Sequence, residues 1–402
     1  MSRRQHKRDN VHISVSAKFI ASIVAILLSL PVVLIGLQGR GDLESFHNRI
    51  LNEWPRFPLW EDPKKYFADA KLWIDDRVYP IIQLSVFRTE LLLNVFDRPP
   101  QKRITIGKNG FIFLNGGTES TVFSIFEEVC INSHRESVAA DLRDALATLQ
   151  AYSKRSGIIF DVVMVPTLPT VYGDYLPESV PEKIRGACRE RAAGRSPLIE
   201  LSRNSAGRFC YPLLEMNAAR GDEAFFPKAN FHAYGMSMKV VRDAYLSARG
   251  LAIPTHERLE PGRFPAEILT MYRIVKNIPA YRFGNDAIHE YKGAAMVFAK
   301  RIKDLFRAPK IDTRILSCST APNGETVFML SDSFGTNASE VFAGAFRRLL
   351  QATSNNMPDS QAPILLDRVK KMEHIDRVIL LVEESNAGRI IDWARAFGDS
   401  AD

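Results

Sequence analysis

The chain alternates short, continuously apolar segments with amphipathic stretches along most of its length. Three apolar runs lack the alternating polar residues of a sheet with one solvent-exposed face. They are typical of parallel strands covered on both faces, and they span residues 158–165, 326–330 and 377–382. The pattern between and before them predicts helices at 137–155, 285–306 and 339–351, and two short strands at 103–106 and 111–114. Strands alternating with helices predict an α/β domain with a mainly parallel sheet over 101–402, with functional loops at the carboxyl ends of the strands.

The N-terminal hundred residues have a different pattern. Residues 19–37 form an uncharged apolar run of about 19 residues, close to the length of a membrane-spanning helix, and basic residues precede it. A cleaved secretory signal is the alternative, although its apolar core is usually only about 7 to 15 residues long. We therefore expect residues 1–38 to be a cytoplasmic segment with a transmembrane signal anchor and 39–100 to be a membrane-proximal helical segment. Both interpretations export the rest of the chain.

The formal net charge of +7 indicates little about a partner. Residues 1–40 account for +5 of it through six basic residues and one aspartate, which leaves +2 for the remainder. The excess of basic residues therefore mainly indicates how the chain is oriented in a membrane, so we expect no nucleic-acid partner.

Four cysteines follow the apolar run: Cys130, Cys188, Cys210 and Cys318. If the chain is exported, they lie in an oxidising compartment where disulfides persist. Four cysteines allow three pairings, and the sequence does not choose among them; Cys188 and Cys210 are the closest pair along the chain. No histidine or cysteine cluster has metal-ligand spacing, so we expect neither a metal nor another cofactor.

A serine follows the predicted strand at 326–330, within the sequence LSDSFG. In open α/β sheets the ligand crevice lies beyond the carboxyl ends of the strands, so Ser333 is placed to present its hydroxyl group there. Capping of the following helix is the alternative role for this loop.

A nucleophilic serine needs a base, usually a histidine held by a carboxylate. Two histidines have suggestive surroundings. His232 lies in a loop rich in glycine and aromatic residues, FFPKANFHAYG, and His289 lies three residues after Asp286. In a segment with a helical pattern, an aspartate and a histidine spaced like Asp286 and His289 more often form a solvated contact between neighbouring turns.

Several segments resemble, in the same order, motifs of the AlgX/AlgJ family of SGNH-hydrolase-like proteins, which O-acetylate exported polysaccharides such as alginate. ITIGKNGFIFL at 104–114 is similar to a family motif near the start of the domain, and VMVPT followed by YGDYLP at 163–177 is similar to a strand and loop. LSDSFG is similar to the nucleophile block, and the His232 loop to the block that carries the histidine. The resemblance covers about residues 60–390 and implies an SGNH-hydrolase-like fold.

By position, the resemblance makes Ser333 the nucleophile and His232 the base, with Asp332 a structural residue of the turn. Asn230 stands where the family has the aspartate that orients the histidine, and an asparagine cannot supply charge to stabilise an imidazolium. Ala233 replaces a tryptophan and Ser331 a glycine. Another carboxylate is then needed, and we consider Asp222, Glu223 and Asp286; without one the site is a weak or lost catalyst.

The function implied by the resemblance is O-acetyl transfer to an exported polysaccharide by an inner-membrane-anchored protein with its catalytic domain in the periplasm. The acetyl group would come from a membrane-bound O-acyltransferase partner. Two alternatives stay open: a carbohydrate acyl-esterase, and a catalytically weak polysaccharide-binding or scaffolding component of a secretion complex. Asn230 is the best support for the last.

Overall fold

The computed structural model describes residues 52–56, 58–75, 87–93, 95–96, 98–116, 121–221, 224–271, 276–307 and 311–400. The chain divides into two units, residues 1–95 and 96–402. In the first unit, helix α3 (Pro63–Asp75) packs Trp73 edge-on against the ring of Trp54. The apolar run at 19–37 lies outside the described residues; among those that are described, none of the helices is long and apolar enough to cross a membrane.

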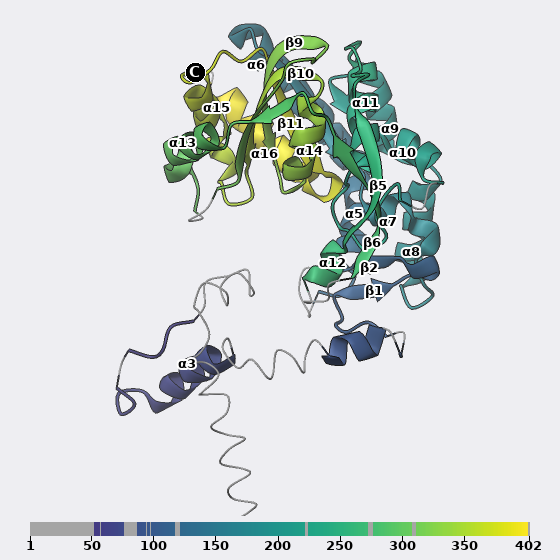
Figure 1. The fold of residues 1–402 in the computed structure, drawn as a ribbon, viewed down its shortest axis with the longest axis vertical. Coiled ribbons are helices and arrows are strands. Elements are labelled where there is room, and N and C mark those ends of the chain that lie inside the picture. The colour runs from purple at the N-terminus through teal and green to yellow at the C-terminus, as the bar shows by residue number, and fades with distance from the viewer. Residues whose placement is uncertain are drawn as a thin grey trace, which may run out of the picture. The chain divides into compact units, whose positions relative to one another are not determined.

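The second unit is built around a seven-stranded sheet with the order β4-β3-β11-β9-β10-β8-β7 (Figure 1). Its strands are β3 (Ile159–Val165), β4 (Phe209–Cys210), β7 (Ile288–Glu290), β8 (Thr313–Cys318), β9 (Asn323–Ser331), β10 (Phe346–Thr353) and β11 (Arg377–Glu383). The pairs from β4 to β10 are parallel, whereas β8 runs antiparallel to β10 and to β7. Two antiparallel hairpins lie outside the sheet: β1 (Ile104–Ile106) with β2 (Ile112–Leu114), and β5 (Arg258–Pro265) with β6 (Asn277–Gly284).

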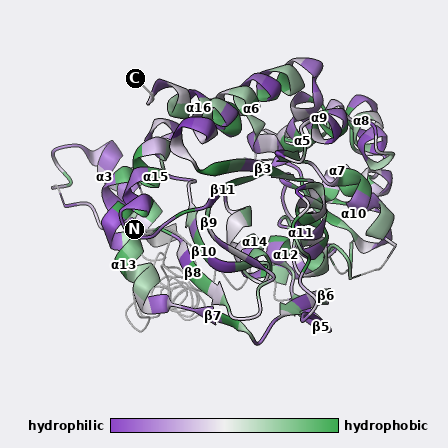
Figure 2. Cartoon of the chain, turned by 90° about the horizontal axis from the view of Figure 1, so that it is seen from above, coloured by the Kyte–Doolittle hydropathy of each residue, from purple (hydrophilic) through white to green (hydrophobic). Residues whose placement is uncertain are grey.

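Helices cover both faces of the sheet. Helix α6 (Glu136–Ser156) and helix α16 (Ala387–Asp399) lie side by side on one face, and α14 (Phe334–Ala343) packs on the other beside α11 (Met236–Ala248) (Figure 2). The other helices of four or more residues are α5 (Ser124–Cys130), α7 (Leu168–Val171), α8 (Glu182–Ala192), α9 (Pro197–Asn204), α10 (Leu213–Ala219), α12 (Glu267–Thr270), α13 (Lys292–Ile302) and α15 (Ala362–Lys370). Because both faces of the sheet are covered, every residue of β11 is buried. This burial explains the continuous apolar run in its sequence.

The predicted α/β class and the mainly parallel sheet are confirmed, with strands at 159–165, 323–331 and 377–383. The predicted helix at 339–351 is wrong. A helix ends at Ala343, and residues 346–353 form β10, whose inner positions are buried between β9 and β8. The prediction of one helix at 285–306 is correct only for α13, because 288–290 pair with β8.

A disulfide joins Cys130 of α5 to Cys188 of α8, while Cys210 and Cys318 are free and buried. The pair nearest along the chain, Cys188 and Cys210, is therefore not the one that forms. Cys210 lies in the edge strand β4 but is buried, and burial raises the pKa of its thiol, which makes it unreactive.

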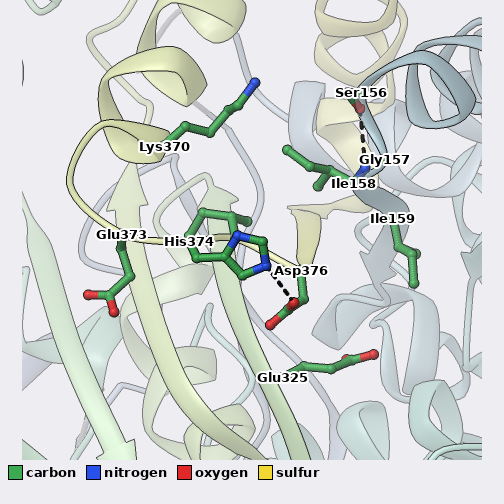
Figure 3. A pocket seen from close by; sticks show the side chains of 10 residues that line it. Ser156, Gly157, Ile158, Ile159, Glu325, Lys370, Glu373, His374 and Asp376 are labelled. Atoms are coloured by element: carbon green, nitrogen blue, oxygen red, sulfur yellow. Dashed lines mark hydrogen bonds and ion pairs between the residues drawn. The ribbon is translucent and has the colours of Figure 1, made fainter.

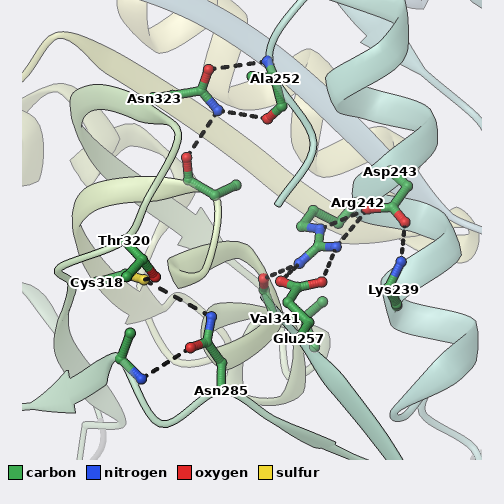
Figure 4. A network of polar contacts seen from close by, with 12 residues as sticks. Lys239, Arg242, Asp243, Ala252, Glu257, Asn285, Cys318, Thr320, Asn323 and Val341 are labelled. Atoms are coloured by element: carbon green, nitrogen blue, oxygen red, sulfur yellow. Dashed lines mark hydrogen bonds and ion pairs between the residues drawn. The ribbon is translucent and has the colours of Figure 1, made fainter. Parts of the chain in front are cut away.

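A buried arginine links two helices that carry the loops of the candidate site. Arg242 of α11 donates from Nη2 to Glu257 Oε2 at 2.7 Å and from Nη1 to the carbonyl oxygen of Val341 in α14 at 2.9 Å (Figure 4). The guanidinium is fully buried and paired with the nearly buried Glu257 and with Asp243, so removal of Arg242 would leave the buried carboxylate of Glu257 without this partner. This contact holds α11 against α14.

Candidate active site

Ser333 lies in a tight turn between β9 and α14. It precedes the first residue of the helix and adopts a helical backbone conformation. Asp332 fixes the turn by accepting hydrogen bonds from the N–H of Phe334 at 2.9 Å, the N–H of Glu383 at 2.7 Å and Nδ2 of Asn386 at 2.9 Å. Asp332 thus holds the Ser333 turn against the end of β11, which agrees with the structural role expected of it.

The serine at position 331 is accommodated by a glycine one helical turn away. The fully buried Ser331 accepts a hydrogen bond from Gln351 Nε2 at 3.2 Å. A Cβ atom on Gly335 would lie 1.7 Å from Ser331 Oγ, so only glycine fits there. The departure from the family pattern at Ser331 is therefore compensated inside the turn.

His232 lies in a loop that packs its aromatic residues inward. Phe225 and Phe226 are fully buried, and the imidazole lies over Phe334 with ring centroids 4.5 Å apart. Gly235 closes the loop with φ +55°, and a Cβ atom there would overlap the carbonyl oxygen of Tyr281 in β6. This packing places Nε2 of His232 2.9 Å from Oγ of Ser333. The structure thus brings together the two residues that the sequence singled out, 101 positions apart.

Glu267 supplies the carboxylate that was missing from the sequence interpretation. Its Oε1 is hydrogen-bonded to Nδ1 of His232, and its Oε2 accepts from the N–H groups of Phe231 at 3.1 Å and His232 at 3.0 Å. Burial would raise the pKa of Glu267, but these hydrogen bonds from His232 and Phe231 bring it below the ordinary value. The carboxylate therefore stays ionised at neutral pH and selects the tautomer with the proton on Nδ1, which leaves Nε2 free to accept from Ser333.

Asn230 acts on Glu267 rather than on the imidazole. Its Oδ1 accepts a hydrogen bond from the backbone N–H of Glu267 at 3.0 Å, at the first residue of α12. Of the carboxylates proposed for the orienting role, Asp286 is bonded to Arg258 at 2.7 Å, while Asp222 and Glu223 lie outside the described residues. Asp286 does not orient His232.

His289, the alternative base, is not brought near Ser333. It lies on β7 rather than on a helix, is exposed, and contacts the ring of Tyr291 edge-on at 4.5 Å.

The turn also offers a site for a developing negative charge. The N–H group of Ser333 donates to no acceptor among the described residues, and it lies at the positive end of the ten-residue helix α14. A backbone N–H and a helix N-terminus directed at the reacting oxygen are the usual elements of an oxyanion hole. Within the part of the chain that the structure describes, no group of three or more His, Cys, Asp or Glu side chains could hold a metal ion.

Comparisons with known proteins give structural neighbours only. No family model and no curated protein sequence matches the chain. The O-acetyltransferase domain of Pseudomonas putida AlgJ is 13% identical and aligns over 74% of this chain and 99% of its own with a TM-score of 0.43. Pseudomonas aeruginosa AlgX is 10% identical over 72% of this chain and 66% of its own, with a TM-score of 0.39. Bacillus cereus PatB1 is 8% identical over 69% and 95%, with a TM-score of 0.40.

AlgJ and AlgX are thus among the neighbours. They carry the names of the family that the sequence motifs resemble. Because the identities and TM-scores are low, the functional argument rests on the geometry of Ser333, His232 and Glu267.

Glu267 is the residue of this array that sequence reasoning missed. It lies 35 positions after His232, at the end of a hairpin strand, and an acidic residue in the first turn of a helix is too common to attract attention. Only the folding of the β5 strand against the His232 loop reveals its role.

Proposed function

We propose that this chain is an O-acyltransferase that acetylates hydroxyl groups of an exported polysaccharide through an acyl-enzyme on Ser333. The observation that carries the proposal is the continuous array from Ser333 Oγ through the His232 ring to Glu267, in which each group has the partner that its role requires. Asn230 was the best support for a scaffold, but it no longer argues against catalysis because Glu267 supplies the carboxylate next to His232.

In the first half-reaction His232 Nε2 takes the proton of Ser333 as Oγ attacks the acetyl carbonyl carbon of the donor. The N–H of Ser333 and the N-terminus of α14 stabilise the oxyanion, and Glu267 stabilises the imidazolium through Nδ1. When the tetrahedral intermediate collapses, the bond between the carbonyl carbon and the leaving oxygen breaks, and His232 gives its proton to that oxygen. An acetylated Ser333 remains.

In the second half-reaction a sugar hydroxyl gives its proton to His232 and attacks the acetyl carbon. The bond to Ser333 Oγ breaks, and the proton returns from His232 to that oxygen. A carbohydrate acyl-esterase uses the same residues with water as the acceptor, so the identity of the acceptor alone separates the two activities.

Our proposals for the polysaccharide substrate, the cellular location and the acetyl-supplying partner are based on the sequence. The ordered motifs support an AlgX/AlgJ-like, SGNH-hydrolase-like protein, and the apolar run at 19–37 supports an inner-membrane anchor with the catalytic unit in the periplasm. The Cys130–Cys188 disulfide agrees with an oxidising compartment. Within this proposal, a membrane-bound O-acyltransferase supplies the acetyl groups.

The test is transfer of acetyl from para-nitrophenyl acetate to oligosaccharides by the purified full-length chain. A burst of nitrophenol followed by acetylated sugar supports the transferase, whereas a burst followed only by acetate supports the esterase. No burst, and equal rates for the unmodified chain and its Ser333→Ala variant, would contradict both.

A further inference from the structure

A pocket of about 330 Å³ lies beside the catalytic array without including it. All three segments that carry the array also line this pocket. Tyr234 and Gly235 follow His232, Phe264 precedes Glu267 by three residues, and Asn337 lies one helical turn after Ser333. Residues four apart on a helix are neighbours on one face, with Cβ atoms about 5–6 Å apart, so the pocket begins one turn from the nucleophile.

The lining combines aromatic rings with exposed charged groups. The half-buried rings of Tyr234 and Phe264 lie 5.8 Å apart and tilted. The guanidinium of Arg282 has no hydrogen-bond or ion-pair partner among the described residues, and Glu340 reaches only Arg314, at 3.9 Å. Rings that offer an apolar surface next to donors and acceptors suit a ligand with one apolar face and a rim of hydroxyl groups.

The positions of these rings are fixed by backbone contacts. Gly235 lies against the carbonyl oxygen of Tyr281 in β6, so the strand that carries Arg282 also holds the loop that carries Tyr234. Asn337 reaches from α14 to the carbonyl oxygen of Ala233 at 3.5 Å. Burial and the nearby Glu340 raise the pKa of the Tyr234 hydroxyl group, which therefore stays protonated and can donate a hydrogen bond at neutral pH.

We infer that this pocket is the acceptor subsite, where one pyranose ring of the polysaccharide binds against the exposed faces of Tyr234 and Phe264 while a hydroxyl group of the polysaccharide reaches the acetylated Ser333. The inference rests on the proposed function. The pocket is larger than an acetyl group needs, and its charged rim does not suit an alkyl chain, so a hydroxylated sugar is the occupant that its chemistry favours. Arg282 and Glu340 then bind polar substituents at the rim of the ring.

The experiment separates the two half-reactions of the full-length chain. Para-nitrophenyl acetate is the donor, and cellopentaose, chitopentaose and an oligogalacturonide are the acceptor probes. For Tyr234→Ala and Arg282→Ala we expect the acceptor kcat/KM to fall about tenfold, the loss expected from truncating an anchoring side chain. The nitrophenol burst should fall less, so that more of the acyl-enzyme is lost to water. Arg263→Ala is the matched control, because Arg263 is exposed on β5 and donates to the carbonyl oxygen of Asn277.

Binding of the same probes to the full-length Ser333→Ala variant, measured by calorimetry, gives a readout independent of turnover. Addition of Tyr234→Ala should weaken binding at least several-fold. Equal transfer and equal affinity in the pocket variants would overturn the subsite, as would no detectable binding of any probe. Absence of a burst in the unmodified chain would instead contradict the proposed function.

Discussion

Two of the histidine–carboxylate pairs in the described residues lie at opposite ends of the central sheet. At the carboxyl end of the strands, His232 contacts Glu267 and Ser333. At the amino end, Nε2 of His374 lies 3.1 Å from Oδ1 of Asp376, in a pocket of about 450 Å³ at the beginning of β3, β9 and β11 (Figure 3). Both regions also contain a serine, Ser333 in one and Ser156 in the other.

The two pairs differ in burial and in the third partner. The His232 side chain is 16% exposed and that of His374 is 85% exposed, so water screens the second pair and weakens it. Ser156 Oγ accepts from the N–H of Ile158 at 3.3 Å and has no bond to His374 among the described contacts. The comparison teaches that a carboxylate alone does not prepare a histidine to act as a base. Unlike His374, His232 is also ordered by packing and has a serine hydroxyl group within reach of its other nitrogen.

The largest expected effect separates the two serines. Ser333→Ala removes the nucleophile, so the nitrophenol burst should fall by at least about 10³-fold. Ser156→Ala, the matched change at the amino end, should leave the burst within about twofold of the unmodified chain, since Ser156 only bonds the local backbone. Stopped-flow absorbance measures both. A normal burst in Ser333→Ala would place the nucleophile elsewhere.

Substitution of the carboxylates should have the next largest effect on the burst rate. Glu267→Gln keeps the shape of the side chain but removes the charge that stabilises the imidazolium, so the burst rate should fall by about 10² to 10⁴-fold. Asp376→Asn, the matched change on the exposed pair, should have no effect on the rate. Rates are compared with circular dichroism spectra to exclude unfolding, and equal rates for Glu267→Gln and the unmodified chain would remove Glu267 from the array.

Substitution of Asn230 should have a smaller effect on the burst rate. Asn230→Ala removes one hydrogen bond to the backbone of Glu267, worth about 1 kcal/mol, so the rate should fall about fivefold. Asn230→Asp keeps the acceptor and should bring no gain, because Glu267 already supplies the charge. A large gain in the burst rate of Asn230→Asp would show instead that the asparagine impairs the triad.

The smallest effect concerns stability at the carboxyl end of the sheet. Burial and the neighbouring Asp332 raise the pKa of Glu383 to about 8, so the native state holds a proton that the unfolded chain loses near pH 4.5. The contribution of Glu383 to stability is therefore greatest below that pH, declines as the pH rises, and reaches its minimum above about 8. Glu383→Gln should raise the Tm by about 2 to 4 °C at pH 8.5, and less at pH 5.5. A gain that does not depend on pH would contradict this origin.

Much of the fold could be predicted from the local pattern of apolar residues. Buried parallel strands such as β3 and β11 have continuous apolar sequences. Strand β10 was mistaken for a helix because Arg347 and Arg348 at its start interrupt the apolar run, and only the pairing with β9 and β8 decides its conformation. In the site, Ser333 and His232 lie within recognisable loops. Glu267 does not, because the contact that gives it a role is made by tertiary packing across 35 residues. The same reason hid the Cys130–Cys188 pairing across 58 residues.

The most direct test of the array is to locate the acetyl group after quenching the reaction with para-nitrophenyl acetate. Peptide mass spectrometry of the full-length chain should find acetyl on Ser333, and the amount formed during the burst should be strongly reduced in His232→Ala and Glu267→Gln but not in Asp376→Asn. Ser156 and Ser331 in the same digest serve as internal controls. Acetyl absent from Ser333, or present there in equal amount in all of these variants, would contradict the account.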